Sequence, residues 1–419
     1  MEEIEVPKYF MCPISLQIMR DPVTTITGIT YDRESIEKWL STTLVITSSS
    51  SSNDMITCPV TKLPLPRDSD LTPNHTLRRL IQAWCTINAC NGVDRIPTPT
   101  PLLDKRQVLK LLRELVGANN NKFIITLKKI VALAEQNERN RRLMVEGGVN
   151  KAMALFLIRC FKEGNNVVGI EEALRILRLV WTPNDEVKAF VNENSDFVDS
   201  LAWILSCSSE KDMRFEVISV LKMAIEVANS SRMERLRLEM FMNITKKVLG
   251  ERSVSHQTIK SALHVLIEAC PWGRNRMKII DSGAVFELIE LELTKPERHT
   301  TEMIINLLAH LCSCADGRAK LLQHACGIAM VSKKILRVSE ATDDRAIHIL
   351  SLIAKFSATN EVIIEMLRVG AVTKLCMVMQ ADCAPYLKEK ATSILRLHSK
   401  VWNDSPCIAV YLLSRHPRY

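Results

Sequence analysis

Aromatic residues and glycine are both scarce in this sequence. Of its 419 residues, 5% are aromatic and 13 are glycine, whereas 47% are hydrophobic. The core must therefore be built mainly from Leu, Ile, Val, Ala and Met, which are side chains that suit helices. At this length we expect either two or three domains, or one small domain followed by an extended repeat array.

Long apolar runs and a secretory signal are also missing. Charged residues interrupt every apolar run well before a membrane-spanning length, so no transmembrane helix is expected. The first five residues, MEEIE, are acidic, whereas a signal peptide begins with basic residues. The 13 cysteines are odd in number and irregularly spaced, which favours reduced thiols packed as small hydrophobic side chains. We therefore expect a cytoplasmic protein, and a nuclear location stays open.

The formal net charge of +8 is concentrated in the C-terminal part. Residues 1–90 hold eight basic and ten acidic residues, which leaves 47 basic and 37 acidic residues in 91–419, a net charge of +10. Arginines that carry this excess include Arg139, Arg141, Arg142, Arg232, Arg235 and Arg237. They indicate either a solvated helix face, the simpler interpretation, or a surface for an acidic or phosphorylated partner. No nucleic-acid partner is expected.

Residues 1–90 predict a small α+β domain with its core at 5–80. Residues 23–31 have β-branched side chains on both sides of a Thr-Gly pair, which predicts a hairpin, and Asp32 is a candidate N-cap of a first helix. A second helix is expected after Asn74. Its apolar stripe consists of Leu77, Leu80, Ile81 and Trp84, at positions i, i+3, i+4 and i+7.

Two segments are too biased in composition to form a core. Residues 41–54 include a run of five serines and predict a loop inside the first domain, where a phosphorylation site stays open. Residues 91–104 include alternating Pro and Thr, which favour polyproline II and predict a semi-rigid linker.

Residues 105–419 repeat a helical unit. Turns containing Gly148, Gly283, Gly327 or Gly370 each follow a short segment that starts with Asn or a small residue. The last three lie 44 and 43 residues apart, and the first two lie 135 apart, so two divergent copies are expected near 193 and 238. A helical repeat of this length is typical of armadillo and HEAT proteins, whose units stack because none buries its apolar face alone. The third helices are expected to include residues 173–180, 262–269, 304–311, 346–355 and 391–398.

Two Cys-Pro steps stand where a zinc-binding RING domain would carry paired cysteines. Cys12 and Cys58 are each followed, at the C-x-x-C spacing, by a hydroxyl residue, Ser15 and Thr61. Residues 1–90 contain four cysteines and one histidine, too few for two tetrahedral sites, so no metal and no cofactor are expected. Hydrogen bonds and charge pairs must then hold the loops, and the candidates are Ser15, Asp21, Asp32, Arg33, Thr61 and Asn74.

Four blocks of this region occur in the order found in the U-box, a zinc-free relative of the RING domain. They are residues 12–23, 28–33, 58–61 and 71–81. With the repeats behind them, the whole chain resembles the plant U-box/armadillo ubiquitin ligases. The resemblance implies a mainly α fold, in which a small α+β U-box at 1–90 precedes an armadillo-repeat α-solenoid at 105–419. It also implies a role in plant defence or stress signalling.

The resemblance further implies a role for individual positions. Loop one presents Ile14 and Leu16, loop two presents Pro59, and the helix between them presents Trp39, so that together they form a shallow apolar groove for the ubiquitin-conjugating enzyme. Lys62 stands where related ligases carry a basic residue that bridges ubiquitin and the conjugating enzyme. Asn74 either contacts the partner or caps a helix.

The implied mechanism uses no catalytic residue of the ligase. The chain contains no Ser/His/Asp set and no phosphate-binding loop, so a substrate lysine recruited by the repeats would attack the thioester of the conjugating enzyme directly, accelerated by proximity. Cys12 and Cys58 are disfavoured as nucleophiles, because no histidine in their motifs lowers their pKa. The cluster His310, Cys312, Cys314, His324 and Cys326 is expected to hold packed thiols, since residues i and i+2 of a helix face apart.

Three other interpretations stay open at this point. The first is a non-catalytic armadillo adaptor with a degenerate U-box, and the second is a nuclear-import-type receptor for basic peptides, which the positive charge of the repeats disfavours. The third is a zinc-dependent RING. The sequence does not determine the oligomeric state, and a homo-oligomer is one option.

Overall fold

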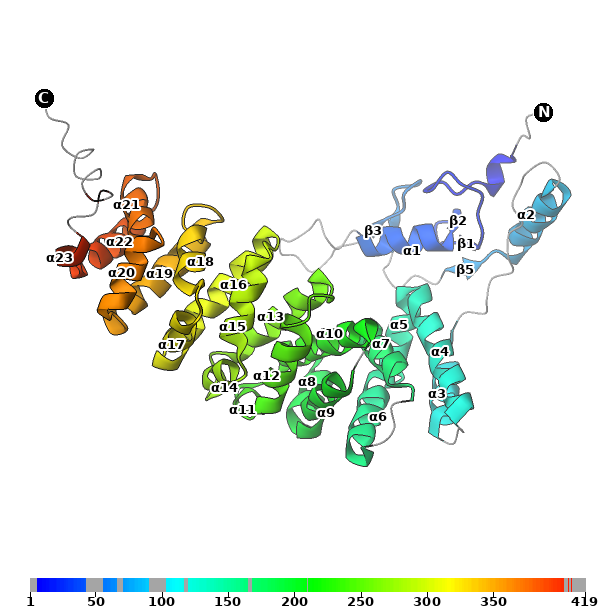
Figure 1. Cartoon of the computed structure of the whole chain (residues 1–419). Coiled ribbons are helices and arrows are strands. Elements are labelled where there is room, and N and C mark those ends of the chain that lie inside the picture. The colour runs from blue at the N-terminus through cyan, green and yellow to red at the C-terminus, as the bar shows by residue number, and fades with distance from the viewer. Residues whose placement is uncertain are drawn as a thin grey trace, which may run out of the picture. The chain divides into compact units, whose positions relative to one another are not determined.

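The computed structural model describes residues 6–42, 56–65, 71–89, 103–116, 120–164, 168–208 and 210–402, together with 406 and 408. The chain divides into two compact units, residues 1–102 and 103–419, and each is described by itself (Figure 1). Most of the serine-rich segment and most of the proline-rich segment predicted from the sequence lie outside the described residues.

The first unit is a small α+β domain built around a three-stranded sheet. Its elements are η1 (Lys8–Phe10), β1 (Pro22–Thr24), β2 (Thr30–Asp32), α1 (Arg33–Thr42), β3 (Ile56–Thr57), β4 (Pro64–Leu65), β5 (Thr72–Pro73) and α2 (His75–Ile87). The strand β1 lies between β2 and β5 and is antiparallel to both, and β3 pairs with β4. The predicted hairpin is confirmed, with Val23 opposite Tyr31 and Gly28 in the turn at a φ of 77°.

The helix α2 turns a different face to the core than its apolar spacing predicted. Ile81 and Cys85, one turn apart, are buried, whereas Leu80 is 52% exposed. The predicted stripe was therefore wrong at Leu80, because the buried face is centred on Ile81 and a neighbouring helical residue points about 100° away from it.

The second unit is a solenoid of helices that follow one another from α3 to α23 (Figure 1). Two helices come first, α3 (Lys105–Val116) and α4 (Asn120–Gln136). In the described residues, six units of three segments follow: α5 (Glu138–Glu146), α6 (Val149–Glu163), α7 (Ile170–Val180); α8 (Asp185–Glu193), α9 (Ser195–Cys207), α10 (Lys211–Val227); α11 (Ser230–Glu234), α12 (Leu238–Ile244) with η3 (Thr245–Leu249), α13 (His256–Ala269); α14 (Asn275–Asp281), α15 (Ala284–Leu293), α16 (Arg298–Leu311); α17 (Ala315–Gln323), α18 (Gly327–Lys334), α19 (Glu340–Phe356); α20 (Asn360–Arg368), α21 (Ala371–Gln380), α22 (Pro385–Leu397). The short helix α23 (Ser399–Trp402) ends the series.

The predicted third helices are confirmed as the main parts of α7, α13, α16, α19 and α22. The glycines of these turns stand at two neighbouring positions: Gly283 and Gly370 directly precede their helices, whereas Gly327 is the first residue of α18. Gly283 and Gly370 adopt left-handed φ angles of 86° and 79°, which side-chain-bearing residues rarely adopt. At Gly327, in contrast, a Cβ atom would overlap the carbonyl oxygen of Leu321, so close packing requires the glycine. The third unit has Arg237 and no glycine before α12, and its α12 continues into the π-helix η3.

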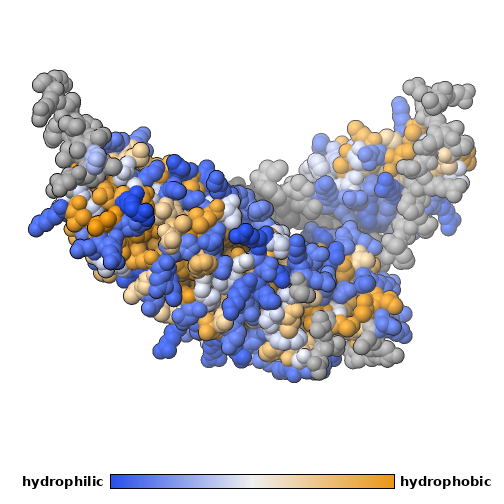
Figure 2. Space-filling model, in the orientation of Figure 1, coloured by the Kyte–Doolittle hydropathy of each residue, from blue (hydrophilic) through white to orange (hydrophobic). Residues whose placement is uncertain are grey.

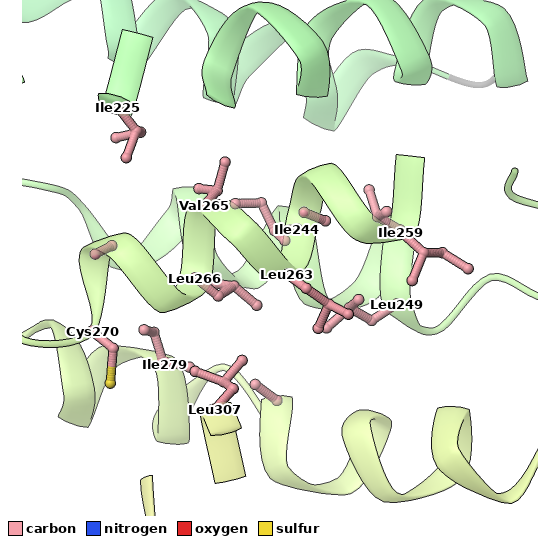
Figure 3. Close-up of a cluster of buried hydrophobic side chains, with 14 of the residues drawn as sticks. Ile225, Ile244, Leu249, Ile259, Leu263, Val265, Leu266, Cys270, Ile279 and Leu307 are labelled. Carbon is pink, nitrogen blue, oxygen red and sulfur yellow. The ribbon is translucent and has the colours of Figure 1, made fainter. Parts of the chain in front are cut away.

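The core of the solenoid is continuous between units. Figure 3 shows side chains of α13, among them Leu263 and Leu266, with Ile225 of the preceding third helix on one side and Leu307 of the following one on the other. All four side chains are buried. Polar residues cover much of the face seen in Figure 2, with apolar patches between them. No helix in the described parts of the chain is long and apolar enough to span a membrane.

Candidate functional site

The two Cys-Pro steps form loops with the same backbone construction, which we call loop one (residues 12–17) and loop two (residues 58–63). In loop one the Cys12 amide donates to the carbonyl of Gln17 (2.8 Å) and the Leu16 amide donates to the carbonyl of Cys12 (2.9 Å). In loop two Cys58 and Lys62 make the equivalent bonds, at 2.8 and 3.0 Å. The fifth residue of each loop is left-handed, with φ angles of 54° at Leu16 and 59° at Lys62. The fixed backbone aims each of these side chains outward.

The cysteine sulfurs act as hydrogen-bond acceptors in place of metal ligands. Both cysteines are completely buried. The sulfur of Cys12 accepts from the amide of Asp32 (3.3 Å), and the sulfur of Cys58 lies 3.0 Å from the hydroxyl of Tyr31. The hydroxyl of Thr27 also donates to Cys58, at 3.4 Å. Since Tyr31 and Asp32 are neighbours in β2, one short strand holds both loops.

These bonds change the acidity of the buried thiol in loop two. Burial alone would raise the pKa of Cys58, but hydrogen bonds from Thr27, Thr61 and Tyr31 outweigh it and lower this pKa to about 6. As the sequence predicted, no histidine is involved, but hydroxyl and amide donors lower the pKa in its place. Its complete burial still argues against a nucleophile, which must be accessible to its substrate.

A charge network fixes the segment between loop one and α1. The carboxylate of Asp32 accepts from the amides of Arg20 (2.8 Å) and Asp21 (2.9 Å). The guanidinium of Arg33 donates to the carboxylate of Asp21 at 2.6 Å, and Arg78 of α2 approaches the same carboxylate at 3.8 Å. Asp21, Asp32 and Arg33 thus belong to the predicted network. Asp32 directly precedes α1, at the position of the predicted helix cap. Its carboxylate, however, accepts hydrogen bonds from the amides of Arg20 and Asp21.

The residues proposed to form the groove lie on or beside the two loops. Ile14 and Pro59 are half-buried, and Leu16 is 73% exposed. Trp39 of α1 is 39% exposed, and its indole N–H donates to the carbonyl of Thr57 at 3.2 Å, directly before loop two. Loop one is held to loop two through β2, and Trp39 is held to loop two through this bond.

Of the two predicted bridging residues, Lys62 is exposed at the left-handed position of loop two. Asn74 is occupied in a structural role. Its side-chain oxygen accepts from the backbone amide of Leu77 at 3.0 Å, and its backbone amide donates to the carbonyl of Pro22 at 2.9 Å. It caps α2 and joins that helix to β1.

Groups of three or more His, Cys, Asp or Glu side chains able to hold a metal do not occur among the described residues. In the His/Cys cluster of the solenoid, burial raises the pKa of the Cys312 thiol, and His324 lies 3.0 Å from the carboxylate of Glu290. These side chains pack and pair as separate features of the helices.

Tyr31 and Thr27 are the site residues that sequence reasoning missed. Tyr31 is completely buried, in the same hairpin as Thr27. The signal was the alternation of side chains along the strand, which places Tyr31 on the face opposite its neighbours Thr30 and Asp32. Nothing in the sequence links that face to a cysteine 27 residues further along the chain.

Comparison with known sequences identifies both units. Residues 6–89 match the U-box domain, and residues 107–418 match the ARM repeat region of plant U-box proteins. Among curated proteins of Arabidopsis thaliana, the chain is 41% identical to E3 ubiquitin-protein ligase PUB24 (99% of this chain, 96% of the relative). It is also 41% identical to E3 ubiquitin-protein ligase PUB23 (99% and 98%) and 37% identical to E3 ubiquitin-protein ligase PUB22 (99% of both).

Solved structures agree on the fold of the repeats. A chain from a structure of the phosphorylation-controlled interaction between cadherin and β-catenin superposes with a TM-score of 0.57 at 13% identity, over 77% of this chain and 58% of that one. An engineered protein superposes with a TM-score of 0.50 at 18% identity, over 70% and 68% of the two chains. At such low identity these likenesses concern the fold alone.

Proposed function

Because this chain belongs to the plant U-box and armadillo-repeat family of ubiquitin ligases, we propose that its two loops and Trp39 dock a ubiquitin-conjugating enzyme. The repeats then recruit the protein whose lysine receives ubiquitin. Docking and recruitment together bring the thioester and the lysine within reach of each other, which supplies the acceleration.

The observation that carries this proposal is the exposure of Leu16 on a fixed backbone. For a leucine that is 73% exposed and left-handed, both the contact with water and the φ angle cost free energy. Such a residue gains stability only when a partner covers it, and strained residues of this kind cluster at binding sites. Ile14, two positions earlier in the same loop, and Pro59 of the matching loop extend the apolar surface.

The chemistry proposed needs no nucleophile in the ligase. The lysine amine attacks the thioester carbonyl, the C–N bond forms as the C–S bond breaks, and the thiol of the conjugating enzyme leaves. Loops one and two, held rigidly by β2, restrict the orientation of the docked enzyme. Lys62, at the left-handed position of loop two, would add a point charge at the rim of this surface, without the planar fork that an arginine would offer.

Discharge of ubiquitin from a charged conjugating enzyme to free lysine tests this function. Ile14→Ala in the full chain should slow discharge about tenfold or more, since apolar anchors dominate such interfaces. The matched control is Ile26→Ala, because Ile26 is 62% exposed in the β1–β2 turn and lies in neither loop. Autoubiquitination of the same variants gives a second readout.

The adaptor alternative makes a different forecast for this assay. A non-catalytic adaptor predicts no chains from the wild-type protein and no stimulation of discharge, and that result would refute the ligase proposal. Equal loss in Ile14→Ala and Ile26→Ala would refute the placement of the docking surface. The location in the cytoplasm or nucleus, the role in defence or stress signalling, and a homo-oligomeric state stay predictions, which a fluorescent fusion, a deletion line and light scattering would test.

A further inference from the structure

A cleft of about 490 Å³ on the solenoid is surrounded by basic side chains. It lies where the end of α15 and the start of α16 meet the end of α18 and the turn that leads to α19. Its basic residues are Lys295, Arg298, Lys333, Lys334 and Arg337. The single acidic residue in its lining is Glu292. Charge of one sign therefore gathers around one concave site.

Glu292 and Lys334 form the neutralised floor of the cleft. The side chain of Glu292 is completely buried and pairs with the ammonium group of Lys334. The hydroxyl of Thr301 donates to the same carboxylate at 3.1 Å. Because Lys334 is committed to this pair, the charge that the cleft offers to a ligand comes from the other four basic residues.

Three carboxylates of the same two repeat units are engaged by other groups. Glu297 binds Lys260 at 2.7 Å, and Asp344 binds Lys390 at 2.5 Å. The carboxylate of Asp343 accepts from the amide of Leu336 at 2.6 Å. Of the four, Arg298 pairs with a carboxylate, that of Glu302 at 3.5 Å.

Within the described residues, no carboxylate pairs with three of the cations around the cleft, Lys295, Lys333 and Arg337. All three are exposed. Their charge is therefore both accessible and uncompensated, which makes the cleft attractive to an anion.

Two tight turns fix the rim. Lys295 is left-handed, with a φ of 58°, and its amide donates to the carbonyl of Glu292 at 3.1 Å. On the other side Leu336 is left-handed, with a φ of 60°, and the amide of Arg337 donates to the carbonyl of Lys334 at 3.2 Å. Backbones held in this way lose little further conformational entropy on binding, so that the cost of ordering falls on the side chains.

By contrast, most arginines that the sequence singled out for an acidic partner bond to other groups of this chain. Arg142 pairs with Glu138 at 2.8 Å, Arg237 pairs with Asp199 at 3.2 Å, and Arg141 donates to the carbonyl of Ala134 at 3.2 Å. Arg232 is buried and bonds to the carbonyl of Ser195. Part of the basic excess of the solenoid therefore lies around the cleft, away from these arginines.

We propose that this cleft binds a phosphorylated segment of a protein partner. A phosphate group carries nearly two negative charges and several acceptor oxygens, and the guanidinium groups of Arg298 and Arg337 can each bind it through two parallel hydrogen bonds. The volume suits one phosphorylated side chain with its neighbours. Single-stranded nucleic acid would favour aromatic stacking platforms, whereas the lining residues include no aromatic side chain. That this partner is a substrate of the ligase rests on the proposed function.

The test uses the full chain and a fluorescein-labelled pool of peptides with a central phosphoserine between randomised positions. The same pool without phosphate is the reference, and fluorescence anisotropy measures binding. The cleft variant is Lys295→Gln/Lys333→Gln/Arg337→Gln. The control variant, Lys246→Gln/Arg252→Gln/Lys320→Gln, removes the same charge from exposed residues that do not line the cleft.

We expect the phosphorylated pool to bind more tightly than its reference and the cleft variant to weaken this binding about tenfold or more. The control variant should change affinity less than about twofold. Equal weakening by both variants, or no preference for phosphate, would overturn the proposal.

Two other ligands provide a further test. If phosphoinositide vesicles or a single-stranded oligonucleotide bind more tightly than the peptides, and if the cleft variant weakens that binding too, the proposal is also overturned. Discharge to free lysine does not involve the cleft, so failure here with normal discharge leaves the proposed function intact.

Discussion

The hydroxyl group of Tyr31 lies 3.0 Å from the sulfur of Cys58, and both side chains are completely buried. Burial raises the pKa of Tyr31, and its bond to Cys58 and the charge of that sulfur raise it further. Tyr31 therefore keeps its proton and donates it to a sulfur that is readily ionised. This pair has part of the structural role of a zinc ion in a RING domain, because it joins loop two to the sheet.

Replacing Tyr31 by phenylalanine should destabilise the first unit. The variant keeps the ring but removes the donor, and a hydrogen bond to a charged acceptor contributes about 1–3 kcal/mol. Calorimetry of the full chain should show the transition of the first unit at lower temperature, with that of the solenoid unchanged. Tyr9→Phe is the matched control, since Tyr9 is 64% exposed. Unchanged melting of Tyr31→Phe would contradict this account of loop two.

Stability of the first unit should depend on pH through Cys58. Its pKa falls from an ordinary 9.0 to about 6 on folding, so its contribution is fully present above pH 9 and is lost as pH falls to 6. The melting temperature should therefore decrease from pH 9 to pH 6, and the decrease should be smaller in Cys58→Ala.

Cys85→Ala is the control for this pH series. Burial raises the pKa of Cys85 above its ordinary 9.0, so that thiol is largely protonated in both states up to about pH 8 and adds little to the slope between pH 6 and pH 8. Slopes that are equal in Cys58→Ala and the wild type would show that Cys58 is not ionised in the folded unit.

Trp39 should contribute to ubiquitin transfer mainly through its exposed ring. Trp39→Phe retains an apolar ring but loses the bond to the carbonyl of Thr57, so discharge should slow about two- to fivefold. Trp39→Ala removes the ring as well and should slow discharge about tenfold or more. Trp272→Ala in the solenoid, with similar exposure of 38%, should leave discharge unchanged. Equal rates for Trp39→Ala and Trp272→Ala would exclude Trp39 from the docking surface.

Two glycines in corresponding turns of the repeat, at neighbouring positions, should respond differently to alanine. Gly370 needs only its left-handed φ, and nothing lies within 4 Å of the position that a Cβ would take, so Gly370→Ala should cost about 1 kcal/mol. Gly327→Ala drives a Cβ into the carbonyl oxygen of Leu321 and should cost about 2–3 kcal/mol. Urea denaturation followed by helical circular dichroism measures both. A larger loss at Gly370 would reverse the assignment of their roles.

The fold was largely predictable because its signals are local. Asn275, for example, was expected to start a short helix, and it does so with its side-chain amide donating to the carbonyls of Ala269 and Met233. The predicted hairpin likewise follows from β-branched residues around one turn.

What the sequence did not predict depends on contacts between distant residues. The lowered pKa of Cys58 requires donors from Thr27 and Tyr31, which only the folded hairpin brings to loop two. The basic cleft joins residues from two consecutive repeat units, so no local pattern announces it. The exposure of Leu80 depends on which neighbours α2 meets, since its apolar spacing fits two adjacent faces.

The short strand β2 has a consequence for how this domain tolerates change in length. Loop two is positioned by bonds from Thr27, Tyr31 and Trp39, which all precede residue 43 in the chain. A peptide tag or reporter inserted between residues 43 and 55 would lengthen the chain between these donors and loop two without removing Thr27, Tyr31 or Trp39.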